Sequence, residues 1–143
     1  MRLTFFTDYG LRVLMRLAGE PDRAFTTAEL ADEFRISRNH LAKVISALAA
    51  AGYIEARRGG GGGATLARPA SEIRLGEVVA RLEAGKPLVE CFAPVGNSCT
   101  LTPQCRLKAR LAHAVQVFLD DLDRTTLADC AYPAGAACPR PRD

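Results

Sequence analysis

Three cysteines in the second half of the chain are the residues best able to bind a metal. Cys91, Cys99 and Cys105 stand eight and then six residues apart. Thiolates are the ligands that iron-sulfur clusters and other soft metal centres prefer. Zinc sites usually pair cysteines about two to four residues apart, and three such thiols can also be buried and inert. The spacing therefore leaves two interpretations open, a metal or cluster site and a set of packed thiols.

The remaining cysteines, Cys130 and Cys138, lie in or near the C-terminal tail, outside this group. The first residues, Met-Arg-Leu-Thr, have no long apolar stretch of the kind that directs secretion. We therefore expect a cytoplasmic protein with reduced thiols rather than a disulfide framework. Neither histidine belongs to a Ser/His/Asp or Cys/His arrangement, so we predict that the chain is not an enzyme.

A second polar group in the first half of the chain suits contact with DNA bases. It consists of Ser37, Arg38, Asn39 and His40, with Lys43 one helical turn later. Arginine can bridge the acceptors of guanine, asparagine can read adenine, and serine or histidine can bond to base or phosphate. The alternative is a helix face that is simply exposed to solvent.

The surrounding pattern predicts a helix-turn-helix. Apolar residues spaced three and four apart predict a helix over 7–19, and Thr26 with Glu29 forms a capping-box pattern for a second helix through Phe34. Ser37 is placed to cap a third helix that ends near Gly52. The polar group would then occupy the first turns of the third helix, where a recognition helix enters the major groove.

Residues 53–57 and 64–68 predict two short strands on either side of Gly59–Gly63, and Pro69 ends the ribbon. Arg57 and Arg58 could lie along a narrow minor groove if this ribbon is a wing. An isolated glycine run is more often a flexible linker, but its place after a helix-turn-helix favours the wing. We therefore predict a mainly α fold, a winged helix-turn-helix followed by a long C-terminal dimerisation helix.

The second half predicts one further helix around Leu75–Leu82, an irregular loop and a long helix. Thr102-Pro103 is a favourable helix start, and apolar residues then follow one face for about 20 residues, roughly 30 Å. Cys105 would lie in the first turn. The expected organisation is a DNA-binding domain over 1–84, a cluster-binding loop over 85–104, a dimerisation helix and following segment over 105–130, and a disordered tail over 131–143.

Composition limits the remaining classes of protein. The chain has 143 residues, of which 48% are hydrophobic and 24% charged, with a net charge of +3. Apolar runs are interrupted by charges well before the roughly 18 residues needed to span a bilayer, so we expect no membrane association. A modest positive charge permits phosphate contact without requiring it.

Taken together, these residues resemble the winged-helix iron-sulfur regulators that include IscR and NsrR, from Met1 to about Asp129. The match is carried by the DNA-reading group, the three cysteines and several short stretches: Thr7-Asp8-Tyr9-Gly10-Leu11-Arg12, Gly52-Tyr53, Arg58-Gly59 with Gly62-Gly63, Pro69-Ala70-Ser71-Glu72-Ile73, Cys105-Arg106-Leu107-Lys108 and Thr126-Leu127-Ala128-Asp129. Gly60-Gly61 and Thr65 depart from the pattern, since relatives carry polar or basic residues there.

The resemblance implies an NsrR-type repressor that forms a homodimer on a palindromic operator. It further implies a four-iron cluster, with a two-iron cluster as the alternative, held by the three cysteines of one subunit and by Asp8 of the other. Nitric oxide would then act as the signal that releases DNA from the nitric-oxide detoxification genes. Taken alone, Asp8 is equally well explained as a charge that complements the dipole of the first helix.

Other members of this group remain alternatives. IscR-like relatives carry a histidine ligand at the position of Lys108, which disfavours that assignment, whereas an iron-responsive regulator of the RirA type shares the cysteine spacing. A small electron-transfer protein would leave the helix-turn-helix and wing without a purpose. An enzyme with a reactive cysteine would lack a general base.

Overall fold

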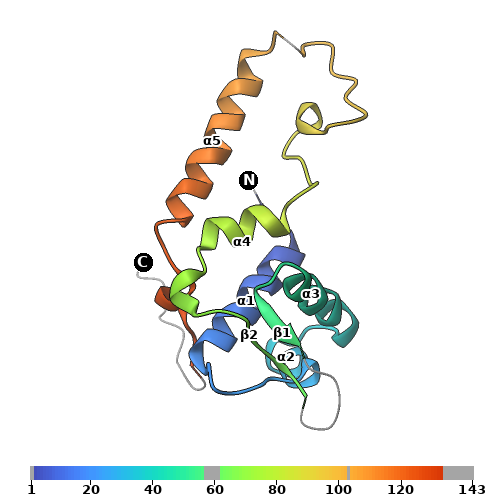
Figure 1. The fold of residues 1–143 in the computed structure, drawn as a ribbon. Helices are drawn as coiled ribbons and strands as arrows, with labels where there is room; N and C mark the ends of the chain where they lie inside the picture. The colour runs from blue at the N-terminus through green and yellow to red at the C-terminus, as the bar shows by residue number, and fades with distance from the viewer. Residues whose placement is uncertain (1, 57–61, 103, 134–143) are drawn as a thin grey trace, which may run out of the picture.

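The computed structural model describes residues 2–56, 62–102 and 104–133, and these form a mainly helical protein with one small sheet (Figure 1). The mainly α fold predicted from the sequence is thus confirmed. In chain order the elements are α1 (Phe5–Gly19), α2 (Thr27–Phe34), α3 (Arg38–Ala50), β1 (Ile54–Ala56), β2 (Ala64–Leu66), η1 (Ala70–Glu72), α4 (Leu75–Leu82), η2 (Glu90–Phe92), α5 (Arg106–Leu122) and η3 (Leu127–Cys130).

The first helix begins two residues earlier than the apolar pattern predicts. Thr4 adopts extended backbone geometry and its hydroxyl accepts a hydrogen bond from the Thr7 N–H, so α1 starts at Phe5. The core face is also rotated relative to the predicted stripe. Leu14 is fully buried as predicted, and Val13 and Leu17 share the core with it. Helices and hairpin cover α1 from several sides, which buries more of its surface than one stripe.

A helix-turn-helix and a short hairpin follow. Thr26 and Glu29 exchange hydrogen bonds in a complete capping box at the start of α2, as the sequence predicts. The two strands pair antiparallel, with Ile54 opposite Leu66 and Ala56 opposite Ala64. They are three residues each, shorter than expected. An additional bridge joins Phe25 to Ala64, so the segment before α2 extends the sheet by one contact.

The long helix starts later than predicted. Cys105 is the N-cap residue and α5 begins at Arg106, whereas Thr102-Pro103 was the expected start. The cause is local, because the N–H of Thr102 bonds to the Cys99 carbonyl and closes a turn before the helix. Pro103 lies outside the described residues. Cys105 therefore precedes the first turn of α5 instead of lying in it.

The chain returns to the first half of the protein after α5. The N–H of Leu127 donates to the Ile73 carbonyl over 2.8 Å, and the Leu127 side chain is fully buried in the main core. Further along, the N–H of Tyr132 donates to the Met15 carbonyl over 2.9 Å. The segment that follows α5 is thereby joined to the first half of the protein by backbone hydrogen bonds. Within the described residues no helix is both long and apolar enough to cross a bilayer.

Candidate functional site

The predicted DNA-reading residues share one exposed surface. Leu41, Val44, Ile45 and Leu48 bury one side of α3 in the core. The other side carries the exposed predicted contacts, namely Ser37, Arg38, Asn39, His40 and Lys43. Ser37 is the N-cap residue, yet its side chain makes no capping hydrogen bond. Its hydroxyl is therefore not consumed by the helix.

Arg38 contacts an acidic residue of the preceding helix. Its Nη2 lies 3.3 Å from Oδ2 of Asp32, which belongs to α2, and the two side chains are 66% and 71% exposed. An exposed pair of this kind contributes about 0–1 kcal/mol, so it holds the guanidinium only loosely. No sequence signal marks Asp32, because the pair spans six residues and depends on the angle between two helices.

A buried arginine fixes the helix-turn-helix to α1 and to the hairpin. Arg16 is 3% exposed and pairs with Glu33 of α2 at 2.9 Å and with Glu20 at 2.8 Å. Its guanidinium lies 4.5 Å from the centroid of the Phe25 ring, and Arg23 lies 4.4 Å from the same ring. Since Phe25 bridges to the hairpin, this group links α1, α2 and the hairpin.

The predicted wing is only partly described. The strands that lead into it are present, and Gly63 packs closely beside Phe25, where an added Cβ would lie 3.0 Å from the Phe25 carbonyl oxygen. The predicted contacts Arg57 and Arg58, and the glycines 59–61, lie outside the described residues. Arg68, at the other end of the ribbon, pairs with Glu77 at 3.1 Å and so faces the protein rather than a ligand.

The three predicted cysteine ligands lie on the irregular segment between α4 and α5, which Figure 1 shows at the end of the molecule opposite the β1–β2 hairpin. Cys91 is in η2, Cys99 is in the following turns and Cys105 precedes α5. All three are free thiols and half-buried. The segment is held together by Ser98, whose N–H and hydroxyl both donate to Glu90 over 2.7 Å.

One of these thiols has a pKa below its ordinary value. A hydrogen bond from the Leu101 backbone N–H, followed by one from the Thr102 side chain, lowers the pKa of Cys99. Both bonds favour the thiolate over the thiol. No local sequence pattern indicates this effect, because it depends on the turn that follows Cys99.

The single chain does not bring the predicted ligands together. Among residues 2–56, 62–102 and 104–133, no group of three or more His, Cys, Asp or Glu side chains is placed to hold one metal ion. Asp8 lies on the first turn of α1, where it pairs with Arg12 at 2.8 Å and is 41% exposed. The chemistry of the donor set nevertheless fits an iron-sulfur cluster, since three reduced thiols share one segment and an exposed carboxylate is available to a second chain.

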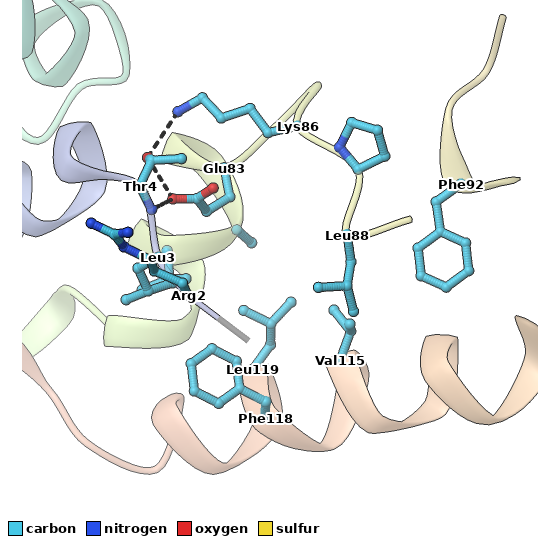
Figure 2. A pocket seen from close by; sticks show the side chains of 13 residues that line it. Arg2, Leu3, Thr4, Glu83, Lys86, Leu88, Phe92, Val115, Phe118 and Leu119 are labelled. Atoms are coloured by element: carbon cyan, nitrogen blue, oxygen red, sulfur yellow. Dashed lines mark hydrogen bonds between the residues drawn. The ribbon is translucent and has the colours of Figure 1, made fainter. Parts of the chain in front are cut away.

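A cavity of about 420 Å³ separates the cysteine segment from the helix-turn-helix half (Figure 2). Its floor is α5, which contributes Val115, Phe118 and Leu119, and Phe92 lines it next to Cys91. At its edge the carboxylate of Glu83 accepts hydrogen bonds from the N–H and hydroxyl of Thr4 and from the hydroxyl of Thr7. The lining of this cavity therefore combines apolar side chains with one polar cluster around Glu83.

Comparison with known families gives a direct result. The model of the Rrf2 family, described as iron-dependent transcriptional regulators, matches residues 3–133. The chain belongs to the Rrf2 family. Its function is therefore transcription regulation through DNA binding, and as an Rrf2 member it is a regulator rather than an enzyme, in agreement with the prediction from sequence.

Solved structures of Rrf2-like regulators share this fold. The Staphylococcus aureus CymR oxidized form is 29% identical, and the match covers 95% of this chain and all of that one at a TM-score of 0.68. CymR of B. subtilis, described as its global cysteine regulator, is 26% identical over 92% of this chain and 96% of that one, at 0.66. IscR of T. potens is 23% identical, and the match covers 97% of this chain and 94% of that one at a TM-score of 0.69. This likeness supports the fold alone.

Proposed function

We propose that this Rrf2 regulator is a repressor that reads DNA with α3 and responds to nitric oxide through an iron-sulfur cluster. One observation carries the proposal: three free thiols share the segment that runs directly into α5, and the other end of α5 returns to the DNA-reading half. In this proposal residues 1–84 bind DNA, residues 85–104 hold the cluster, residues 105–130 form the dimer contact and residues 131–143 are a tail.

Base recognition rests on the exposed side of α3. Arg38 and Asn39 supply the side-chain types that bond to guanine and adenine, and Ser37, His40 and Lys43 supply further contacts to base or phosphate. Arg57 and Arg58 of the wing would bind the adjacent minor groove. Two copies on a palindromic operator would place their recognition helices one turn of DNA apart.

The exposed apolar surface of α5 supports a homodimer. None of its residues is buried in the single chain, and Leu107 and Val117 are 64% and 51% exposed. Large apolar side chains that are exposed along a helix favour association with another protein surface, because burying them removes apolar area from solvent. A second copy of α5 provides a matching surface by symmetry.

The cluster ligands would be Cys91, Cys99 and Cys105 of one protomer and Asp8 of its partner. When bound, a four-iron cluster supplies an iron atom at which nitric oxide can react, and a two-iron cluster remains the alternative. Asp8 forms an exposed ion pair with Arg12, which costs little to break. The three thiols would keep the 85–104 segment in one conformation, and through α5 they would set the distance between two recognition helices.

A redox- or iron-responsive regulator is the second candidate. Two observations favour a thiol switch, namely the likeness to the oxidized form of S. aureus CymR and the lowered pKa of Cys99. A RirA-like protein would instead use the same cysteines to report iron supply.

Anaerobic purification separates these candidates. We expect the full chain to carry iron and sulfide. Titration with nitric oxide should bleach the absorbance of the cluster, and the protein should release a DNA fragment from the promoter of its own gene. A variant with Cys91, Cys99 and Cys105 all replaced by serine should carry no iron and lose the response, whereas the control Cys130→Ser should behave as the parent. Protein without iron, or a triple variant that responds fully, would contradict the cluster proposal.

A second experiment concerns the carboxylate ligand. Asp8→Ala should retain a cluster on the three thiols and change its rate of reaction with nitric oxide, because a hard, labile ligand has been removed. Asp22→Ala, at an exposed position beyond α1, is the matched control. An unchanged rate in Asp8→Ala would remove this residue from the scheme.

A further inference from the structure

The turn between α2 and α3 contains an arginine in a backbone conformation that favours glycine. Arg35 has φ 55° and ψ 44°, and among the described residues it is the only non-glycine residue with positive φ. An L side chain is sterically disfavoured in this region, whereas glycine enters it freely.

The fold imposes this conformation. The N–H of Ile36 donates to the Ala31 carbonyl over 2.9 Å, and the N–H of Arg35 donates to the Asp32 carbonyl over 3.3 Å. These two bonds form the Schellman arrangement that ends a helix with one left-handed residue. Ile36, the next residue, packs half-buried against the core. Any residue at position 35 must therefore adopt the left-handed backbone conformation if Ile36 is to reach the core.

The arginine side chain does not compensate for this cost within the protein. Arg35 is exposed, and in the part of the chain that the structure describes no ion pair includes it. The two acidic residues just before it on α2, Glu33 and Asp32, pair with Arg16 and Arg38. The backbone of Arg35 is strained, and none of the ion pairs in the described residues offsets that cost. Such a residue favours a role in binding a partner outside the protein.

We propose that Arg35 binds a phosphate of the DNA backbone at the rim of the major groove. The inference rests on the proposed use of α3 as the recognition helix. When the first turn of such a helix enters the groove, the preceding turn stands over the sugar-phosphate rail. Arg35 lies three residues before Arg38, so one arginine would reach a base edge while the other holds the backbone. Phosphate is the partner that its permanent charge and planar donors fit best.

Three substitutions separate the charge from the strain. Arg35→Gln removes the charge and keeps the disfavoured conformation, Arg35→Lys keeps both, and Arg35→Gly removes both. Arg124→Gln, an 81% exposed arginine beyond α5, is the control for general loss of charge. The readouts are affinity for a mixed-sequence DNA duplex at several salt concentrations and the midpoint of thermal unfolding.

We expect Arg35→Gln and Arg35→Gly to bind DNA about fivefold to tenfold more weakly at moderate salt and to lower the slope of log affinity against log salt by about 1. Arg35→Lys should keep the parent slope, and Arg35→Gly should unfold at a higher temperature than the parent. If Arg35→Gln and Arg35→Gly bind like the parent, the inference is wrong, although DNA reading by α3 stands. If the parent binds no duplex, both proposals fail.

Discussion

Glu83, just beyond the C-terminal end of α4, accepts hydrogen bonds from the Thr4 N–H over 2.9 Å and from the Thr4 hydroxyl over 2.8 Å (Figure 2). Thr4 caps α1, so these bonds join the start of the first helix to the end of the fourth. Lys86 adds a bond to the same hydroxyl over 3.1 Å. The first turn of α1, which carries Asp8, is thereby fixed relative to the segment that leads to the cysteines.

The Glu83 cluster predicts a dependence of stability on pH. Burial alone would raise the pKa of Glu83, but bonds from Thr7 and Thr4 and the charge of Lys86 outweigh it, and the net pKa lies below its ordinary value of 4.5. A carboxyl with a lowered pKa in the folded state stabilises the protein above its unfolded pKa, and that stabilisation is lost as pH falls through the folded pKa. We expect Glu83→Gln to lower the free energy of unfolding by about 1–3 kcal/mol at neutral pH, measured by urea unfolding.

This difference between parent and Glu83→Gln should shrink as the pH falls below about 4.5. Glu55→Gln, at an exposed position of β1, is the control and should follow the parent. A difference that is constant across the acid range would mean that the carboxylate charge does not contribute.

Substitutions of two leucines in the second half of the chain should have different effects, one on stability and the other on self-association. Leu127 is fully buried in the core, and Leu127→Ala should lower the free energy of unfolding by about 2–5 kcal/mol. Leu107 is 64% exposed on α5, so Leu107→Ser should leave the isolated protomer nearly unchanged and weaken self-association. Urea unfolding and sedimentation equilibrium measure the two effects. If Leu107→Ser associates as strongly as the parent, its part of α5 is not in the dimer contact.

At Gly76, α4 approaches α5 so closely that there is no room for a side chain. A Cβ at this position would collide with the Leu119 carbonyl oxygen and with Asp123, whose Oδ1 accepts a 2.8 Å bond from the Glu77 N–H. We expect Gly76→Ala to lower the free energy of unfolding by about 1–3 kcal/mol, because backbone cannot move aside as a flexible side chain can. Arg81→Ala, exposed on the same helix, is the comparison. Equal stability of the two variants would show that the helices separate without cost.

The pair between Asp32 and Arg38 predicts a change in DNA selectivity. Asp32→Asn removes a negative charge beside the reading face, so affinity for mixed-sequence DNA should rise a few-fold while stability changes by less than about 0.5 kcal/mol. Arg38→Ala should instead cost about 1–3 kcal/mol of preference for the promoter fragment over mixed sequence. Fluorescence anisotropy on both duplexes measures these values. A preference that survives Arg38→Ala would exclude Arg38 from base reading.

Local patterns were sufficient to predict most of the elements. The Thr26–Glu29 capping box and the apolar spacing of α3 involve residues within one or two turns of each other, and both appear as expected. The start of α5 was wrong by three residues, since a Cys99–Thr102 turn competes with the helix signal of Thr102-Pro103. Leu127 was assigned to the long-helix segment, because nothing near it in sequence indicates that it packs in the core of the first half.

The candidate site divides in the same way. The exposed group on α3 was predictable, since helical periodicity separates it from the buried side. The Asp32–Arg38 pair, the Arg16 cluster and the lowered pKa of Cys99 were not, because each depends on angles between elements or on a turn. The joint arrangement of Asp8 with the three cysteines stays a prediction.

The sequence by itself determined the kinds of residue available for chemistry, the order of the helices and the family to which they point, because these depend on side-chain type and short-range periodicity. Only the tertiary structure decided that Arg35 is left-handed, that Glu83 holds Thr4 and that Leu127 completes the core. Those contacts join residues far apart along the chain, or are imposed by the need of a neighbour to reach the core, and neither cause leaves a local signal.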